Sequence, residues 1–184
     1  MIGRMTKAAA AILLAATPAT AAEVAGVRLP PGLEVAERTL DLRGCGVREA
    51  YFLNMYVAGL YLPEPGLSQS EILSRDTTKA VRLNIVYDGA LPQDVPDSWR
   101  DRLDEMVRRD VQETISDIYK GFESGDEVTV RYAPAAGTTI SVNGEQTRQT
   151  DDYAVLEGLL RLWIGDRAVS ENLRRLLLIG DCAG

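Results

Sequence analysis

The stretch that most constrains the fold runs from Leu40 to Pro63, because it contains no charged side chain between Ala50 and Leu62. Its aromatic and β-branched residues favour an extended backbone, since such side chains fit a pleated surface. Alternate residues of a strand point to opposite faces, and here both faces are mostly apolar. One carries Phe52, Asn54, Tyr56, Ala58, Leu60 and Leu62, and the other Tyr51, Leu53, Met55, Val57 and Tyr61. The pattern predicts a strand that is covered on both sides.

The segment Gly44-Cys45-Gly46-Val47-Arg48 comes just before this strand. Its two glycines let the backbone bend or approach another group closely. We interpret the segment as a turn that joins a strand over 33–42 to the uncharged strand over 50–62. The two strands would then form a hairpin.

Arg48 would lie at the end of this apolar strand as a permanent cation. An arginine fork can bind a carboxylate or phenolate through two parallel hydrogen bonds. Alternatively, Arg48 pairs with a buried acid or with backbone carbonyls of the protein itself. Arg43 lies close by, and Asn54 and Tyr56 are polar groups of the strand that follows. These four residues form the candidate ligand-binding site.

The first residues have the pattern of a secretory signal peptide. Two basic residues precede a short apolar stretch, and Ala19-Thr20-Ala21 fits the small-residue pattern of a cleavage site. We therefore expect residues 1–22 to be a signal peptide, residues 23–184 to form one domain, and the mature protein to be periplasmic or secreted. A cytosolic amphipathic N-terminus is the alternative. No apolar run reaches the length of a membrane span, so no stable span is expected after signal removal.

Charge and composition exclude several classes of function. The formal net charge of −7 becomes −9 when the signal peptide leaves with Arg4 and Lys7, and such an acidic domain is a poor nucleic-acid binder. The chain has no histidine, which excludes Ser-His and Cys-His nucleophile systems and histidine metal sites. No phosphate-binding glycine motif is present. We expect neither a metal nor a cofactor.

The chain has two cysteines, Cys45 and Cys182. An exported protein can form a disulfide, and a bridge here would tie the C-terminus to the core. Sequence gives no distance between the two, so the pairing stays open at this point.

The order of the expected elements indicates the fold class. Strands are expected over 33–42, 50–62, 79–87, 127–132 and 138–142, and helices over 68–74, from Pro96 to about Gly121, over 151–163 and after Ser170. Strands come first, then a long helix, two strands and further helices. This order predicts an α+β domain with helices packed on one side of a mainly antiparallel sheet.

Several of these segments, taken in order, resemble the exported bacterial branch of the chalcone isomerase-like family. They are Gly44–Arg48, Asn54–Leu62, Gly125–Val128, Val142–Gly144 and Leu162–Gly165, the last followed by a leucine-rich helix. The resemblance runs from about residue 25 to 180. It implies an open-faced β-sandwich, in which helices cover one face of a large antiparallel sheet and a ligand cleft lies between them. The plant enzymes of the family cyclise chalcones to flavanones without a cofactor, and a second branch binds fatty acids.

The resemblance also bears on the candidate site. The family's Gly-x-Gly-Val-Arg pattern, whose arginine steadies an oxyanion, matches Gly44 to Arg48. Counting back from the following strand without a gap favours Arg43 instead. The position of the enzymes' threonine is Tyr56 here, and the fatty-acid-binding branch also has tyrosine there.

At three other positions where the family's enzymes keep polar catalytic side chains, this sequence has different residues. By spacing, the catalytic tyrosine, the asparagine and the last polar contact fall near Asp94, Asp101 and Leu156. The first hypothesis is therefore an exported protein that binds a small apolar anionic ligand, such as a fatty acid, in a cleft anchored by Arg48. One alternative is a cofactor-independent intramolecular lyase or isomerase of chalcone isomerase type. Another is a ligand-free structural or partner-binding domain, and no protein partner is indicated.

Overall fold

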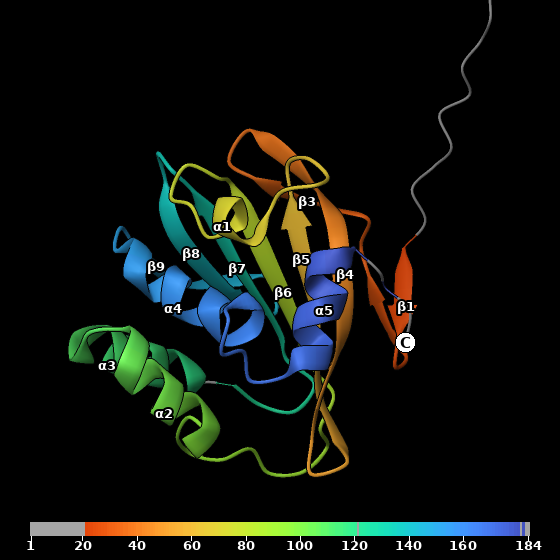
Figure 1. Ribbon diagram of the computed structural model, residues 1–184. Coiled ribbons are helices and arrows are strands. Elements are labelled where there is room, and N and C mark those ends of the chain that lie inside the picture. The colour runs from red at the N-terminus through yellow and green to blue at the C-terminus, as the bar shows by residue number, and fades with distance from the viewer. Residues whose placement is uncertain (1–20, 121, 181, 183–184) are drawn as a thin grey trace, which may run out of the picture.

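A seven-stranded antiparallel sheet forms the body of the computed structural model, which describes residues 21–120, 122–180 and 182 (Figure 1). Each strand pairs with the next along the chain. The strands are β3 (Gly32–Val35), β4 (Arg38–Ala50), β5 (Leu53–Leu62), β6 (Lys79–Ile85), β7 (Glu127–Ala133), β8 (Gly137–Val142) and β9 (Glu145–Thr150). The predicted signal peptide falls mostly outside the described residues.

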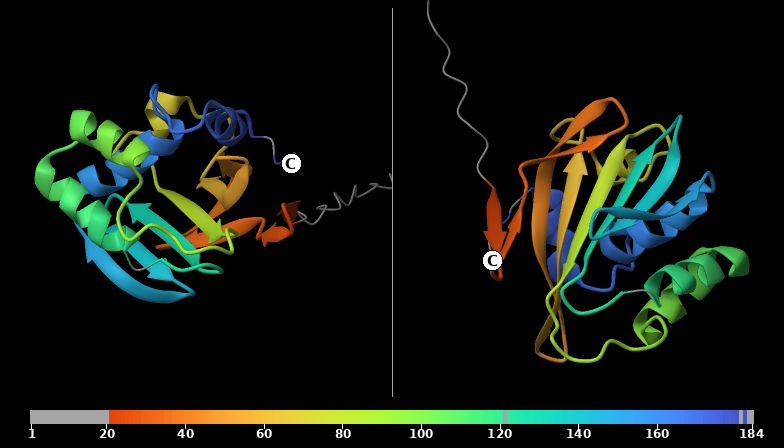
Figure 2. Two further views of the ribbon diagram at one scale, coloured as in Figure 1. Left: turned by 90° about the horizontal axis from the view of Figure 1, so that it is seen from below. Right: turned by 180° about the vertical axis from the view of Figure 1, so that it is seen from behind.

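The helices of the described residues all lie on one face of this sheet. They are α1 (Gln69–Ile72), α2 (Asp97–Met106), α3 (Arg109–Tyr119), α4 (Tyr153–Ile164) and α5 (Glu171–Ile179). The view from behind in Figure 2 shows the opposite face, where a small hairpin of β1 (Ala22–Val24) and β2 (Val27–Leu29) stands beside β4. The predicted α+β fold, an open-faced sandwich with helices on one face, is confirmed. None of the described helices is long and apolar enough to cross a membrane.

The uncharged strand β5 is buried on both faces from Tyr56 onward. On the helix side, Tyr56, Ala58 and Leu60 belong to the main apolar core beneath the helices. On the other side, Val57 packs in a small cluster with Leu29 of β2. The predicted double coverage is therefore confirmed for this part of the strand, whereas residues 51–54 are exposed.

The prediction of a turn at Gly44–Arg48 is wrong, because this segment lies inside β4. The strand runs through it with a register shift between Leu42 and Gly44, and the hairpin turns at Tyr51-Phe52. Helix α5 packs directly on the glycine: a Cβ atom at Gly44 would lie 2.5 Å from two backbone carbonyl oxygens of α5. The glycines therefore serve close approach of a helix and not chain reversal.

The single long helix expected after Pro96 is two helices. Val107 and Arg108 have extended backbone between α2 and α3. Apolar side chains from the break and from α3 pack against α4, where a Cβ atom at Gly158 would lie 3.1 Å from both Val107 and Ile115. A continuous apolar periodicity in the sequence does not reveal such an interruption.

Strand β9 was not expected from the sequence, because its six residues, Glu-Gln-Thr-Arg-Gln-Thr, are all polar. The turn before it carries the signal that was available. Asn143 and Gly144 both have positive φ angles, 51° and 84°, as the two central residues of a tight hairpin require. The Asn-Gly pair thus predicts a returning strand even where no apolar alternation marks one.

A disulfide joins Cys45 to Cys182, across 137 residues of sequence. Cys45 is fully buried in β4, on the face that carries the β1–β2 hairpin. The pairing that the sequence left open is therefore present, and it ties the C-terminal end to the sheet.

Candidate ligand-binding cavity

A cavity of about 470 Å³ lies between the β4–β5 hairpin, the end of β6 and helices α2 and α3. Its size falls within the range of about 300–1,000 Å³ that is usual for small-molecule sites. Most of its lining side chains are apolar or aromatic. The lining consists of Arg48, Glu49, Ala50, Tyr51, Met55, Tyr56, Leu83, Ile85, Leu91, Pro92, Pro96, Asp97, Ser98, Trp99, Tyr119 and Phe122.

Arg48 and Tyr56 lie side by side in this lining. They are direct partners across β4 and β5, so their side chains share one face of the sheet. The Arg48 guanidinium donates a hydrogen bond to the backbone carbonyl of Glu49. Among the ion pairs formed by the described residues, none involves Arg48. A guanidinium has five N–H donors, so several remain for a ligand.

A hydrogen bond from helix α4 fixes the Tyr56 hydroxyl. The indole N–H of Trp163 donates to the Tyr56 hydroxyl oxygen at 2.9 Å. Burial raises the pKa of Tyr56 above its ordinary value, while the Trp163 hydrogen bond and the Arg48 charge oppose this shift. The hydroxyl therefore stays protonated at neutral pH. Because its oxygen accepts from Trp163, its own O–H proton is left to donate to a ligand in the cavity.

Aromatic rings form the inner wall. Trp99 of α2 meets Trp163 edge-on, with ring centroids 6.1 Å apart, and meets Tyr119 of α3 in the same manner at 5.9 Å. Tyr119 in turn packs on Phe122 at 6.1 Å. Edge-to-face contacts of this kind fix ring orientations, so this wall is a preformed apolar surface.

The other two predicted site residues lie outside the cavity lining. Asn54 is exposed and pairs with Glu49 across the hairpin. Arg43 donates to the Asp41 carboxylate at 2.9 Å and sits at the register shift of β4. The structure thus brings Arg48 and Tyr56 together, but not Asn54 or Arg43. That any of the four binds a ligand stays a prediction.

Sequence reasoning missed the side chains that α2, α3 and the loop before α2 bring to the cavity. Trp99 lies within the helix expected after Pro96, but helical spacing does not distinguish a cavity wall from a filled core. Leu91 lies between the strand expected over 79–87 and that helix. Tyr119 and Phe122 lie at the end of the helical pattern, and no motif marks them.

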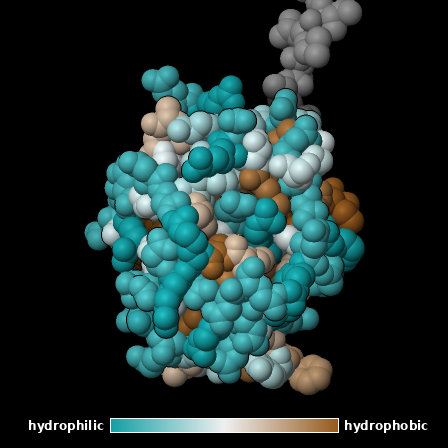
Figure 3. Space-filling model, turned by 60° about the vertical axis from the view of Figure 1, so that its left-hand side comes forward, coloured by the Kyte–Doolittle hydropathy of each residue, from teal (hydrophilic) through white to brown (hydrophobic). Residues whose placement is uncertain are grey.

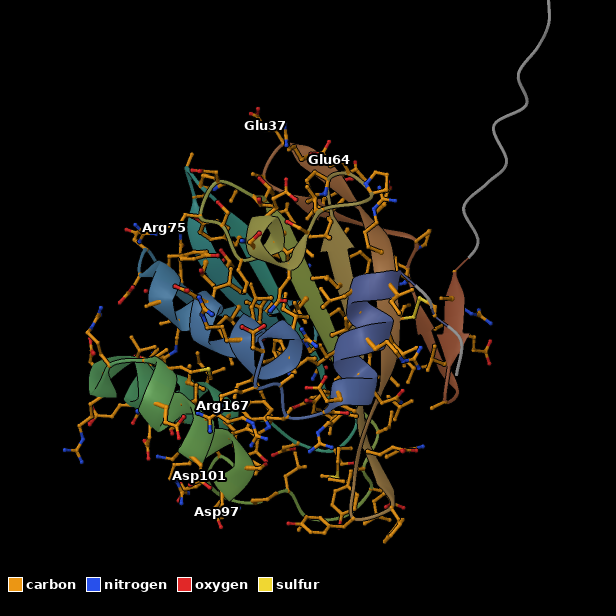
Figure 4. All side chains as sticks on the ribbon, in the orientation of Figure 1. Glu37, Glu64, Arg75, Asp97, Asp101 and Arg167 are labelled. Atoms are coloured by element: carbon orange, nitrogen blue, oxygen red, sulfur yellow. A yellow bond between two sulfur atoms is a disulfide. The ribbon has the colours of Figure 1, made fainter. Side chains whose placement is uncertain are left out.

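The positions where the enzymes keep polar partners do not reach the cavity. Asp94 is exposed and lies 3.7 Å from the Lys120 ammonium group. Asp101 is exposed on α2, where Figure 4 labels it together with Asp97. Leu156 is fully buried in the core. In the part of the chain that the structure describes, no three acidic, cysteine or histidine side chains gather where they could hold a metal ion.

Comparison with known proteins agrees with this architecture. The sequence model of the chalcone isomerase-like family matches residues 21–179. A search of curated proteins found no match. The fold is similar to the crystal structure of a fatty-acid binding protein of Arabidopsis thaliana, with a TM-score of 0.62 and 18% sequence identity over 85% of this chain and 94% of that chain. The chain therefore belongs to the chalcone isomerase-like family.

Proposed function

We propose that this protein binds a small apolar anionic ligand of the fatty-acid type in the cavity between the β4–β5 hairpin and α2–α3. One observation carries the proposal: Arg48 and Tyr56 are paired in an otherwise mostly apolar lining. A ligand carboxylate would accept charge-assisted hydrogen bonds from Arg48 and one more from the Tyr56 hydroxyl. The aromatic wall around Trp99 would contact the tail.

The similar Arabidopsis thaliana structure supports this choice of ligand, because that protein is described as fatty-acid binding. Its likeness covers most of both chains. A guanidinium without a carboxylate partner among the described residues gives an independent reason to expect an anion. Arg48 is partly exposed, so water solvates its charge when no ligand is bound, and a bound carboxylate would replace that water with charge-assisted hydrogen bonds.

Binding without catalysis is the simpler function for this cavity. Asp94, Asp101 and Leu156 stand where the enzymes keep polar partners, and none of the three lines it. A cyclisation rate for chalcone that rises with the amount of purified protein, and is lost in Arg48→Ala, would instead show catalysis.

Export is part of the proposal and rests on the signal-peptide pattern of residues 1–22. N-terminal sequencing of the protein from a periplasmic or secreted fraction tests it. We expect the mature chain to start at Ala22 or Glu23. Soluble cytosolic protein that still begins with Met1 would overturn this part of the proposal.

Calorimetric titration with a long-chain fatty acid and with its methyl ester tests the binding function. We expect the acid to bind more tightly by about tenfold or more, because hydrogen bonds to a charged group contribute about 1.5–3 kcal/mol. Equal affinities would contradict an arginine-anchored carboxylate. Failure of both compounds to bind, together with a lipid-free native mass spectrum of protein purified from its host, would contradict the binding function itself.

A further inference from the structure

The β4–β5 hairpin ends in an exposed apolar tip, Tyr51–Leu53, at the mouth of the cavity. Tyr51 and Phe52 are exposed to 93% and 106% of their reference areas, and Leu53 to 48%. Figure 1 shows the hairpin projecting below the sheet, and Figure 3 shows apolar groups standing out from a mostly hydrophilic surface at the same end. Tyr51 also lines the cavity.

The backbone of this tip is unfavourable for the residues it carries. Ala50 pairs with Leu53, so Tyr51 and Phe52 form a two-residue loop, and both have positive φ angles, 53° and 64°. Such loops favour Asn-Gly, because bulky side chains rarely adopt this region. Two aromatic residues therefore occupy positions where they strain the turn and gain no packing in the protein. Strain of this kind is typical of functional segments.

We propose that this tip inserts into the surface of a zwitterionic phospholipid bilayer. Aromatic side chains are favoured at membrane–water interfaces, and the inserted tip would place the cavity mouth against the lipid. The chain's formal net charge of −7 does not favour attraction to anionic lipids. Insertion would therefore depend on apolar contact and not on charge.

A protein partner fits the tip less well than a bilayer does. Two aromatic side chains bury about 150–250 Å² each, whereas a stable protein interface buries about 800 Å² on each partner. A narrow projecting hairpin offers little further area around them. A bilayer accommodates isolated protruding side chains without a complementary surface.

Docking at the bilayer would let an apolar ligand pass between the membrane and the cavity without crossing water. This role rests on the proposed function, whereas docking itself rests on the tip alone. The two are tested separately below, since Phe52 is not part of the cavity lining.

Flotation of the purified mature protein with dioleoylphosphatidylcholine vesicles tests the proposal, with Phe52→Gly as the variant. Glycine adopts a φ of 64° without strain, so the variant should fold at least as stably as the wild type. We expect its partition onto vesicles to fall about tenfold or more, as the transfer energy of one phenylalanine implies. Phe52→Trp should retain binding. Ile179→Ala, which removes an apolar side chain that is 66% exposed on α5, serves as the matched control and should float like the wild type.

Three results would overturn docking: wild-type protein that does not float, Phe52→Gly that floats equally well, or binding that needs phosphatidylglycerol and is lost in high salt. Calorimetry with a fatty acid separates the two proposals. Phe52→Gly should bind the fatty acid in solution as the wild type does. Flotation without fatty-acid binding would contradict the proposed function and leave docking in place. Fatty-acid binding without flotation would contradict docking and leave the proposed function in place.

Discussion

The indole N–H of Trp163 on α4 donates to the Tyr56 hydroxyl on β5 at 2.9 Å, across the main core. Trp163 is 1% exposed and Tyr56 8%, so water has little access to either group. The bond links the helical layer to the sheet at the point where the cavity begins. It therefore contributes to stability and fixes the position of the Tyr56 side chain in the cavity lining.

Tyr56→Phe is expected to lower the free energy of unfolding by about 1–3 kcal/mol, because it leaves the buried Trp163 N–H without its acceptor. Urea unfolding followed by tryptophan fluorescence measures this. Tyr51→Phe removes a hydroxyl from an exposed side chain and should change the same free energy by less than about 0.5 kcal/mol. Equal effects of the two variants would show that the Trp163 bond contributes nothing to stability.

Gly44→Ala is expected to destabilise the protein by about 1–3 kcal/mol or more, the usual cost of overpacking. The new Cβ atom would lie 2.5 Å from carbonyl oxygens of Leu176 and Leu177, which can move only with α5. Gly59→Ala is the matched control in β5, where the nearest atoms are side-chain carbons at 3.1–3.2 Å. In urea unfolding, Gly59→Ala should lower the free energy of unfolding by less than Gly44→Ala does. A larger loss for Gly59→Ala would contradict the role assigned to Gly44.

Lys79 should make stability depend on pH in the alkaline range. Its ammonium group is buried and donates to the carbonyls of Ile72 and Ser74 and to the Tyr153 hydroxyl, all uncharged acceptors. Burial lowers its pKa from 10.5 to about 8, against the opposing charges of Glu157 and Asp76. Above pH 8 the folded state therefore loses a proton that the unfolded state keeps, and stability rises with pH.

The free energy of unfolding should accordingly increase between about pH 8 and 10, by at most about 1.4 kcal/mol per pH unit. Above pH 10 it should fall, because burial raises the pKa of Tyr61 and Tyr153 and the unfolded tyrosines ionise first. Urea titrations at each pH measure the curve. Lys79→Met should lack the rising portion, and an unchanged slope in that variant would exclude Lys79 as its cause.

Breaking the Cys45–Cys182 disulfide should lower the free energy of unfolding by about 2–5 kcal/mol. The bond closes a chain segment of 137 residues, so it restricts the unfolded chain strongly. Unfolding of the wild type with and without a reducing agent, compared with Cys45→Ala/Cys182→Ala, measures the effect. The reducing agent should lower the unfolding free energy of the wild type toward that of the variant, and it should leave the value for the variant unchanged. Identical midpoints for oxidised and reduced wild type would show that the bond adds no stability.

Much of the fold followed from local patterns in the sequence. A helix was expected over 68–74, where Ser68 and Glu71 form a capping box at the start of α1, and the leucine periodicity after Ser170 marks α5. A local pattern does not show why a glycine is needed at a given position. Gly44 is consistent with either a turn or a close approach, and only the position of α5 decides between them.

The candidate site was predicted only in part for a similar reason. Arg48 stands out by its place in the sequence beside an apolar strand, whereas Trp163 meets Tyr56 from 107 residues away and nothing in its own segment indicates this. Arg43 and Arg48 could not be ranked from sequence, because the glycine pattern favoured one and the spacing to the following strand favoured the other. The structure places Arg48 in the cavity lining and Arg43 outside it.

The two arginines now provide a matched test of the proposed anchor. Arg48 lines the cavity beside Tyr56, whereas Arg43 lies outside it and pairs with Asp41. Arg48→Ala should weaken the binding of a long-chain fatty acid by about 1.5–3 kcal/mol, the range for hydrogen bonds to charged groups. Arg48→Lys should recover part of this, because a point charge does not reproduce the fork. In calorimetric titrations Arg43→Ala should bind as the wild type does, and the uncharged methyl ester should bind equally to the wild type and Arg48→Ala. A loss in Arg43→Ala as large as that in Arg48→Ala would contradict the choice of Arg48 as the anchor.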